Sequence, residues 1–229
     1  GVNQAFKATA SDPKSSSLTW ETVVTNNIGL DMSFLRSRLT FSGDFYIRDT
    51  RNMLTAAMTL PESYGATEPK ENAADLRTIG YELSLGWRDH RMVAGSELSY
   101  GVSASLGDYK TVITRFENES KLLSSHYVGE TLGEIWGYTT DGLFKTDEEA
   151  AAYMAEINDK NVSKGIYGGA APNNVLMAGD LKYKDLNGDK AINSGDNTLD
   201  NPGDRRVIGN SLPRYTYSIK GDLSWYGVD

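Results

Sequence analysis

Several classes of protein are excluded by what this sequence lacks. It has no cysteine, so neither a disulfide framework nor a thiolate site can form. It has no run of about 18 apolar residues, so contact with a bilayer would require the strands of a closed barrel. No run of lysine and arginine stands out and the net charge is −8, which argues against nucleic acid as the main partner.

The motifs of common enzyme classes are also missing. Only two histidines occur, His90 and His126, and neither has a metal-ligand partner at helical spacing. His90 falls in an expected short turn, where a solvated side chain is the simpler interpretation. The sequence contains no nucleophile elbow, phosphate-binding loop or dinucleotide fingerprint, and nothing selects a catalytic pair among its 31 acidic residues. We therefore expect that the protein is not an enzyme.

The N-terminus lacks the features of a native start. Residues 1–4 provide no initiator Met, and neither a basic stretch nor an apolar signal segment is present. We therefore expect a mature or excised fragment.

What the sequence does contain favours β-structure. It has 23 glycines and 13 tyrosines but only 6 prolines, a composition that suits short strands and close backbone approaches. Apolar and polar residues alternate with a period of two, which indicates amphipathic strands. The alternation covers five segments: residues 27–34, 39–48, 78–88, 97–106 and 215–225.

The connections between these segments alternate in length. Residues 35–38 and 89–95 form short turns, whereas residues 51–77 and 107–213 form long connections. Short and long connections in turn are typical of outer-membrane barrels, which have brief periplasmic turns and extended outer loops. Four aromatic residues at strand ends suit the interfacial girdle of such a barrel: Phe34, Trp87, Trp225 and Tyr226. A soluble antiparallel sandwich also alternates apolar and polar residues, so that fold stays open on the pattern alone.

On the barrel interpretation, which the family resemblance described below supports, the predicted fold is all-β: antiparallel strands of a partial outer-membrane β-barrel, with a long extracellular loop region that contains one short helix. Residues 1–106 are expected to form barrel strands with one long outer loop. Residues 107–213 would form the extracellular loop region, and residues 214–229 a further barrel strand. A capping box that begins at Thr146 and includes Glu149 predicts the helix, over about residues 146–158.

The sharpest local motif is a loop of oxygen-bearing side chains within residues 185–196. Its order resembles an EF-hand calcium loop, because hard oxygen ligands fall at positions 1, 3, 5, 7, 9 and 12. The predicted calcium ligands are Asp185, Asn187, Asp189, Ala191 through its carbonyl, Asn193 and Asp196. Two positions depart from the pattern: Lys190 replaces the usual glycine, and Asp196 replaces the usual glutamate. The alternative is a set of Asx-turns that the loop's own backbone satisfies.

A series of short motifs, in order from about residue 18 to residue 229, carries a resemblance to a known family. The motifs are Trp20-Glu21, residues 27–31, residues 44–50 with Met53-Leu54, Asn72, residues 80–83, Val128-Gly129-Glu130, residues 135–138, 140–144, 179–189 and 208–213. Each motif is weak by itself, but their number and order make the set specific. The chain resembles the SusC/RagA family of TonB-dependent outer-membrane transporters.

The resemblance implies a barrel of about 22 strands with an N-terminal plug, of which this chain would be part of the C-terminal half. It also implies an importer of glycans or peptides in the outer membrane, driven by TonB and capped by a SusD-like surface lipoprotein. An excised piece would have two open sheet edges and a lipid-facing apolar surface, so it is expected to self-associate.

Three aromatic residues in the long connection are candidates for substrate stacking: Trp136, Tyr138 and Tyr167. Packing within the loop region is the alternative role for each of them. The competing hypothesis for the whole chain is a soluble, calcium-dependent, β-rich carbohydrate-binding module.

Overall fold

The five segments with period-two alternation form strands of one antiparallel sheet. The computed structural model describes residues 18–56, 70–157 and 176–228. The chain divides into two units, residues 1–117 with 213–229, and residues 118–212. Pro61, Pro69 and Tyr167 lie outside the described residues, as do residues 57–69 of the expected long connection 51–77. The two ends of that connection, residues 51–56 and 70–77, belong to strands and not to a loop as predicted.

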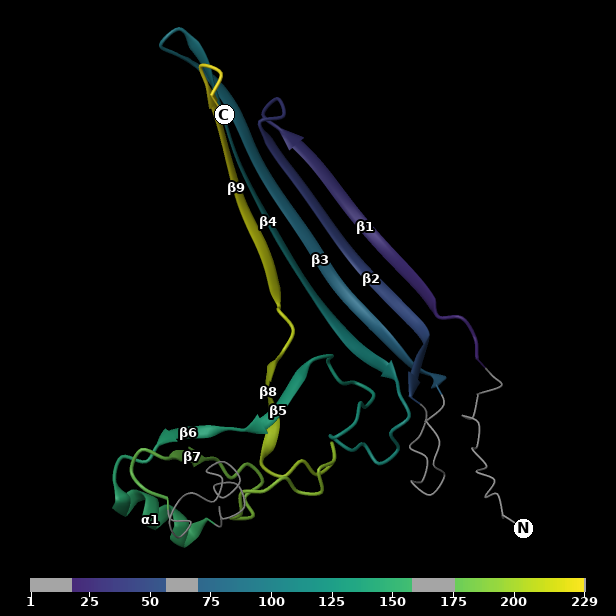
Figure 1. Ribbon diagram of the computed structural model, residues 1–229, viewed down its shortest axis with the longest axis vertical. Coiled ribbons are helices and arrows are strands. Elements are labelled where there is room, and N and C mark those ends of the chain that lie inside the picture. The colour runs from purple at the N-terminus through teal and green to yellow at the C-terminus, as the bar shows by residue number, and fades with distance from the viewer. Residues whose placement is uncertain (1–17, 57–69, 158–175, 229) are drawn as a thin grey trace, which may run out of the picture. The chain divides into compact units, whose positions relative to one another are not determined.

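The first unit is a five-stranded sheet with the order β1-β2-β3-β4-β9 (Figure 1). Each strand pairs antiparallel with its neighbour, so the predicted all-β architecture is confirmed. The strands are β1 (Thr22–Phe34), β2 (Leu39–Ala56), β3 (Lys70–Val93), β4 (Ser96–Arg115) and β9 (Tyr215–Trp225).

The strands are longer than the sequence pattern indicated. The turn expected over residues 89–95 shrinks to Ala94 and Gly95, and His90 lies within β3 opposite Ser99. Both turn residues have positive φ, +50° and +82°, which is the geometry of a two-residue hairpin whose twist matches its strands. The placement of His90 in a turn is therefore wrong.

Strand β4 also passes the boundary expected between residues 106 and 107. It continues to Arg115, still paired with β3 as far as Asp75, and the second unit begins only at residue 118. Residues 107–115 alternate less clearly than the preceding ones, and pairing with an already extended β3 keeps them in a strand.

A β-bulge at Asn52 makes the extension of β2 possible. Thr50 pairs with Leu76, and the next paired residue of β2 is Met53, opposite Ala74. Asn52 has φ +57°, and its backbone N–H donates to Asp75 Oδ1 at 2.8 Å. The Arg115 guanidinium donates to both oxygens of Asp75 at 2.9 Å, so β4 fixes the bulge of β2 through a side chain of β3.

The second unit is built from short elements. They are β5 (Glu134–Tyr138), β6 (Thr140–Leu143), α1 (Asp147–Glu156), β7 (Leu181–Tyr183) and β8 (Arg205–Asn210). Strand β5 pairs with β8, and β6 pairs with β7. Its apolar core has two parts: Phe144, Ala150 and Leu176 with Tyr153 and Met154, and Tyr183 and Ile192 with Tyr138, Ile157 and Leu181.

The helix starts where the capping box predicted. The amide N–H of Glu149 donates to Thr146 Oγ1 at 3.2 Å, and acidic residues occupy the first turn. The Glu149 carboxylate accepts the N–H of Lys145 at 2.9 Å, whereas in a regular capping box it accepts that of the N-cap residue, here Thr146. That bond and the ammonium of Lys182 lower the pKa of Glu149. In the part of the chain that the structure describes, no helix has the length and apolarity needed to cross a membrane.

Candidate functional site

A row of small polar side chains crosses the whole sheet. Because the five strands are in register, one polar residue from each strand falls on the same line. The row is Asp31, Ser42, Ser84, Ser105 and Ser218, from β1 to β9. The hydroxyls of the last two are 2.8 Å apart. We call this side of the sheet the polar face.

The small side chains leave room above the polar face. A depression of about 730 Å³ follows the serine row and the adjacent row that includes Thr40 and Lys220. A second depression of about 410 Å³ shares Ser84 and Ser105 with the first and reaches Glu82. The hydroxyl and charged groups along these depressions can bond to water, which an apolar layer packed over them would prevent.

Carboxylates meet on the polar face, and no lysine or arginine in the described part of the chain forms an ion pair with them. Asp44 of β2 lies directly opposite Glu82 of β3, and Asp31 lies in the neighbouring row. Like charges in register are unfavourable unless solvent screens them. Their arrangement therefore indicates that the polar face is in contact with water.

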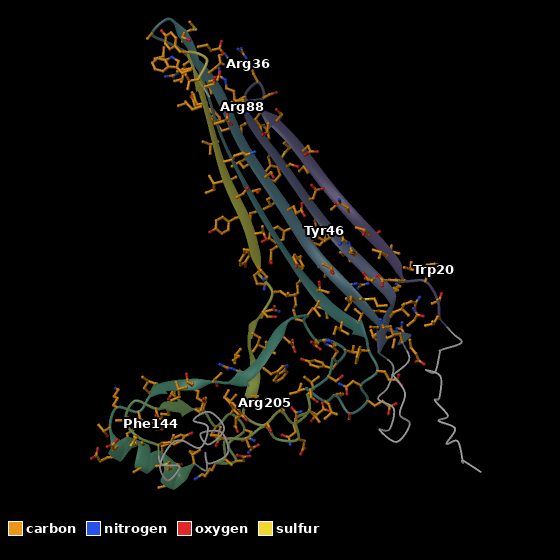
Figure 2. The ribbon with its side chains drawn as sticks, viewed as in Figure 1. Trp20, Arg36, Tyr46, Arg88, Phe144 and Arg205 are labelled. Carbon is orange, nitrogen blue, oxygen red and sulfur yellow. The ribbon has the colours of Figure 1, made fainter. Side chains whose placement is uncertain are left out.

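Tyr46 lies across the polar face over Gly80 (Figure 2). A Cβ atom on Gly80 would be 2.5 Å from the Tyr46 ring, so only glycine admits this close approach. The two residues are cross-strand partners of β2 and β3, where an aromatic ring that covers a glycine adds packing.

The opposite side of the sheet, which we call the apolar face, has no protein layer over it among the described residues. Ile28, Tyr217 and Ile219 are 72%, 75% and 77% exposed. On β3 the apolar residues extend from Ile79 to Trp87, bounded by Arg77 at one end and Asp89 at the other. This length is close to the roughly 9–11 residues of a tilted membrane strand.

The predicted calcium loop is held mainly by Asx-turns. Asp185 accepts the N–H groups of Gly188 and Lys190 at 2.7 and 2.9 Å. Asn187 accepts from Asp189 at 3.0 Å, and Asp189 from Ala191 at 2.8 Å. The side-chain amide of Asn187 and the N–H of Ala191 lower the pKa of Asp189, so this carboxylate is ionised.

The other predicted ligands belong to the same hydrogen-bonded segment. Asn193 Oδ1 accepts from Gly195 at 2.7 Å, and Asp196 Oδ2 accepts from Asn201 at 2.8 Å. Lys190, at φ +62°, places its ammonium 3.5 Å from Glu156 of helix α1 rather than over the loop. Among the described residues, no group of three or more His, Cys, Asp or Glu side chains is arranged to hold a metal ion. Asparagine and carbonyl oxygens, which calcium also accepts as ligands, are not part of that test. The calcium site therefore stays a prediction.

A calcium titration tests this prediction. Because carboxylate and carbonyl oxygens keep free lone pairs beside their Asx-turn bonds, we expect millimolar Ca²⁺ to stabilise the loop, by about 1.4 kcal/mol at ten times the dissociation constant. The measurement is hydrogen exchange of residues 185–196 with Ca²⁺ or with Mg²⁺. Asp189→Ala should remove the response to Ca²⁺. Equal exchange with and without Ca²⁺ would contradict the calcium site.

Sequence reasoning missed Asp204, which anchors the loop from outside. Its carboxylate is fully buried and accepts the N–H of Leu186 at 2.8 Å and that of Asn193 at 2.9 Å. Its own N–H donates to the carbonyl of Asn193 at 3.0 Å. Leu186 near the start of the loop and Asn193 in its second half are thus bound to one residue of the segment that precedes β8.

Two glycines bring the backbones of this region into direct contact. A Cβ atom on Gly203, at φ +63°, would be 2.3 Å from the carbonyl of Asn193 and 2.4 Å from the nitrogen of Gly195. Because these are backbone atoms, no side-chain movement can relieve the overlap.

We expect Gly203→Ala to destabilise the second unit by about 3 kcal/mol or more, from the positive φ and the overlap together. Gly188→Ala is the matched control, since Gly188 has φ +78° and open space around its Cβ position. The control should cost only about 1 kcal/mol. Thermal unfolding of both variants measures the difference, and equal losses would contradict the packing argument.

The aromatic candidates Trp136 and Tyr138 are half-buried within the second unit. Trp136 Nε1 donates to Glu134 at 2.8 Å, and the Tyr138 ring meets Tyr183 edge-on at 5.7 Å. These contacts hold the unit together, which is the packing alternative. Stacking on a substrate stays a prediction for Trp136 and Tyr138, and Tyr167 lies outside the described residues.

Two consecutive turns position Trp136. In residues 127–130 and again in 131–134, a glutamate carboxylate accepts the N–H three residues earlier, at 3.2 and 3.0 Å. Gly129 and Gly133 have φ +95° and +84°, as the third position of such turns requires.

Tyr127 also donates a hydrogen bond to Glu134. Burial is the main cause that raises the pKa of the Tyr127 phenol, and this bond adds to it. His126 lies 3.0 Å from Glu130. The repeated Gly-Glu pair was the sequence signal for these turns.

Comparison with known proteins agrees with this geometry. No protein-family model matches the chain. Two relatives from Formosa agariphila are the TonB-dependent receptor P39, 25% identical over 92% of this chain and 21% of its own length, and the TonB-dependent receptor P3, 23% identical over 100% and 21%. A solved structure described as the RagAB peptide transporter has TM-score 0.59 at 17% identity, over 92% of this chain and 20% of that one.

The chain spans about a fifth of the length of the curated relatives that it matches. The sequence matches agree with the motifs that run along the chain, and the structural match agrees with the order and pairing of its strands. Over most of its length the chain is therefore similar to TonB-dependent receptors of the outer membrane, and it has the fold of part of a RagA-type barrel.

Proposed function

We propose that this chain is a wall segment of an outer-membrane importer, in which the apolar face meets lipid and the polar face borders the aqueous interior. The observation that carries the proposal is the contrast between the two faces of one sheet. The apolar face exposes a band of aliphatic and aromatic side chains as long as a membrane strand, whereas the polar face carries hydroxyls, carboxylates and open space.

Residues 118–212 would contribute to the outer surface in this proposal, where they contact substrate and a lipoprotein. Support comes from the RagAB neighbour, described as a peptide transporter. Energy would come from TonB, as the description of the relatives as TonB-dependent suggests. A peptide or a glycan is the proposed substrate class, and the proposal includes no catalytic step.

The free edges of β1 and β9 would be paired by further strands in the receptor, or by self-association in an isolated piece.

The exposed apolar face weighs against the soluble carbohydrate-binding module. A soluble sandwich would bury this face under a second sheet about 10 Å away, and the described residues provide no such layer.

Cysteine labelling tests which face meets lipid, because the chain has no cysteine of its own. Ser84→Cys and Leu85→Cys place a thiol on the polar and on the apolar face of the same strand, one residue apart. In the full-length receptor in membranes, a water-soluble maleimide should label position 84 and leave position 85 unlabelled. Both thiols should react after denaturation in detergent.

Equal labelling of the two thiols in membranes would contradict the proposal, as would labelling of position 85 alone. A second pair, Ser218→Cys and Ile219→Cys on β9, repeats the comparison on another strand. If the labelling of position 84 came only from a local opening of β3 around the introduced thiol, the pair on β9 would not show the same contrast.

A further inference from the structure

Among the described residues, Arg91 is an arginine without a carboxylate partner at the end of the sheet that carries the short turns. Arg91 of β3 follows Asp89 on the same side of the strand as the apolar face. Its register partner is Leu98 of β4, which in turn pairs with Trp225 of β9. Arg91 is exposed, and no described side chain forms an ion pair or hydrogen bond with its guanidinium.

The nearest carboxylate on that face is already engaged. Asp89 accepts from Arg38 Nε at 3.2 Å, from the Tyr100 hydroxyl at 3.4 Å and from the N–H of His90 at 2.8 Å. Arg38 therefore balances the charge of Asp89, and the positive charge of Arg91 remains uncompensated.

Two further carboxylates near Arg91, those of Asp222 and Glu97, belong to the polar face. Arg88 pairs there with Asp222 at 3.6 Å, and Glu97 alternates to the same side of β4. Neither carboxylate shares the apolar face with Arg91.

Two aromatic rings are held at the same level of the sheet as Arg91, on the second strand from it. Trp225 and Tyr226 meet edge-on with ring centroids 4.9 Å apart. Trp225 Nε1 donates to the carbonyl of Val93 at 3.4 Å, and the Tyr226 hydroxyl donates to that of Ala94. The hairpin turn between β3 and β4 therefore holds both rings by their polar atoms. Rings with an apolar body and an anchored polar edge suit the boundary between acyl chains and headgroups.

We propose that Arg91 binds the phosphate of an anionic phospholipid, with Trp225 and Tyr226 at the same level of the sheet two strands away. A guanidinium offers two parallel N–H donors to a phosphate and is more weakly hydrated than an ammonium, so it suits a partly desolvated interface. The acyl chains of the same lipid would lie on the apolar face, which continues from this point through Leu223 and Trp87. This inference rests on the proposed function, because it requires the apolar face to meet lipid.

Fluorescence quenching by labelled lipids tests the proposal. The full-length receptor is placed in vesicles of unlabelled phosphatidylcholine. Each vesicle preparation also contains one lipid that is brominated on its acyl chains, either phosphatidylglycerol or phosphatidylcholine. The emission of Trp225 is obtained by difference from Trp225→Phe. We expect brominated phosphatidylglycerol to reach the same quenching of Trp225 at a mole fraction about fivefold lower than brominated phosphatidylcholine. This factor is the preference expected for one arginine at an anionic lipid surface.

Arg91→Gln should abolish this preference while total quenching at saturating label is retained. Arg206→Gln is the matched control, an exposed arginine of the second unit whose loss should leave the preference unchanged. Equal quenching of the wild type by both lipids, or a preference retained in Arg91→Gln, would overturn the lipid site but leave the lipid-facing sheet intact. If neither lipid quenches Trp225, the proposed function fails and this inference fails with it.

Discussion

Replacement of Asp204 by alanine is expected to open the loop 185–196 and to destabilise it by about 4 kcal/mol. The substitution removes a fully buried carboxylate that accepts two backbone N–H groups, those of Leu186 and Asn193. Hydrogen bonds to a charged acceptor contribute about 1.5–3 kcal/mol each, and a buried donor left without a partner costs about 1–3 kcal/mol. The effect is therefore large for a single side chain outside the predicted ligand set.

Hydrogen exchange of the amides of Leu186 and Asn193 measures this effect, and about a thousandfold faster exchange corresponds to the stated loss. Asp200→Asn is the control, because Asp200 is an exposed aspartate whose ion pair with Lys121, at 3.0 Å, lies on the surface. Surface ion pairs contribute about 0–1 kcal/mol, so exchange in the control should hardly change. Unchanged exchange in Asp204→Ala would show that the Asx-turns hold the loop without the anchor.

Arginine at the centre of the apolar band is expected to destabilise the receptor in membranes by about 2–4 kcal/mol, the cost of this side chain at the bilayer midplane of a barrel. Leu83 is the position to test, since it lies midway between Ile79 and Trp87 on the apolar face of β3. Its neighbour Ser84 points to the polar face, beside the depressions, so Ser84→Arg should cost less than about 1 kcal/mol.

Urea unfolding of the two variants in lipid vesicles gives the comparison, with heat-modified electrophoretic mobility as a second measure of barrel folding. A larger loss for Ser84→Arg than for Leu83→Arg would reverse the assignment of the two faces. Similar losses would indicate a sheet that is buried on both sides.

Strand positions could be predicted because the signal for a strand is local. Alternation of side chains between two faces is a property of each segment by itself, so all five strands were found, as was the cap of α1 at Thr146. The ends of the strands could not be found in this way. His90 and residues 107–115 belong to strands because a partner strand is already extended beside them.

The candidate site was predictable only in part, for the same reason. Sequence reasoning found Asp185 and Asn193 through their spacing, but Asp204 lies outside the motif and reaches them only through the folding of the segment before β8. The serine row likewise depends on register, because Ser42, Ser84 and Ser105 belong to different strands and nothing in their spacing aligns them.

The sequence alone determined that this chain forms amphipathic antiparallel strands with a capped helix in a long connection, because side-chain periodicity and capping act between neighbouring residues. The tertiary structure decided where the strands end, which polar residues share a row, and which buried carboxylate holds the Asx loop. It also decided that Arg91 and Trp225 share one level of the sheet, and that no described carboxylate pairs with Arg91. These features require residues far apart in the chain to meet, and only the register of the sheet and the packing of the second unit bring them together.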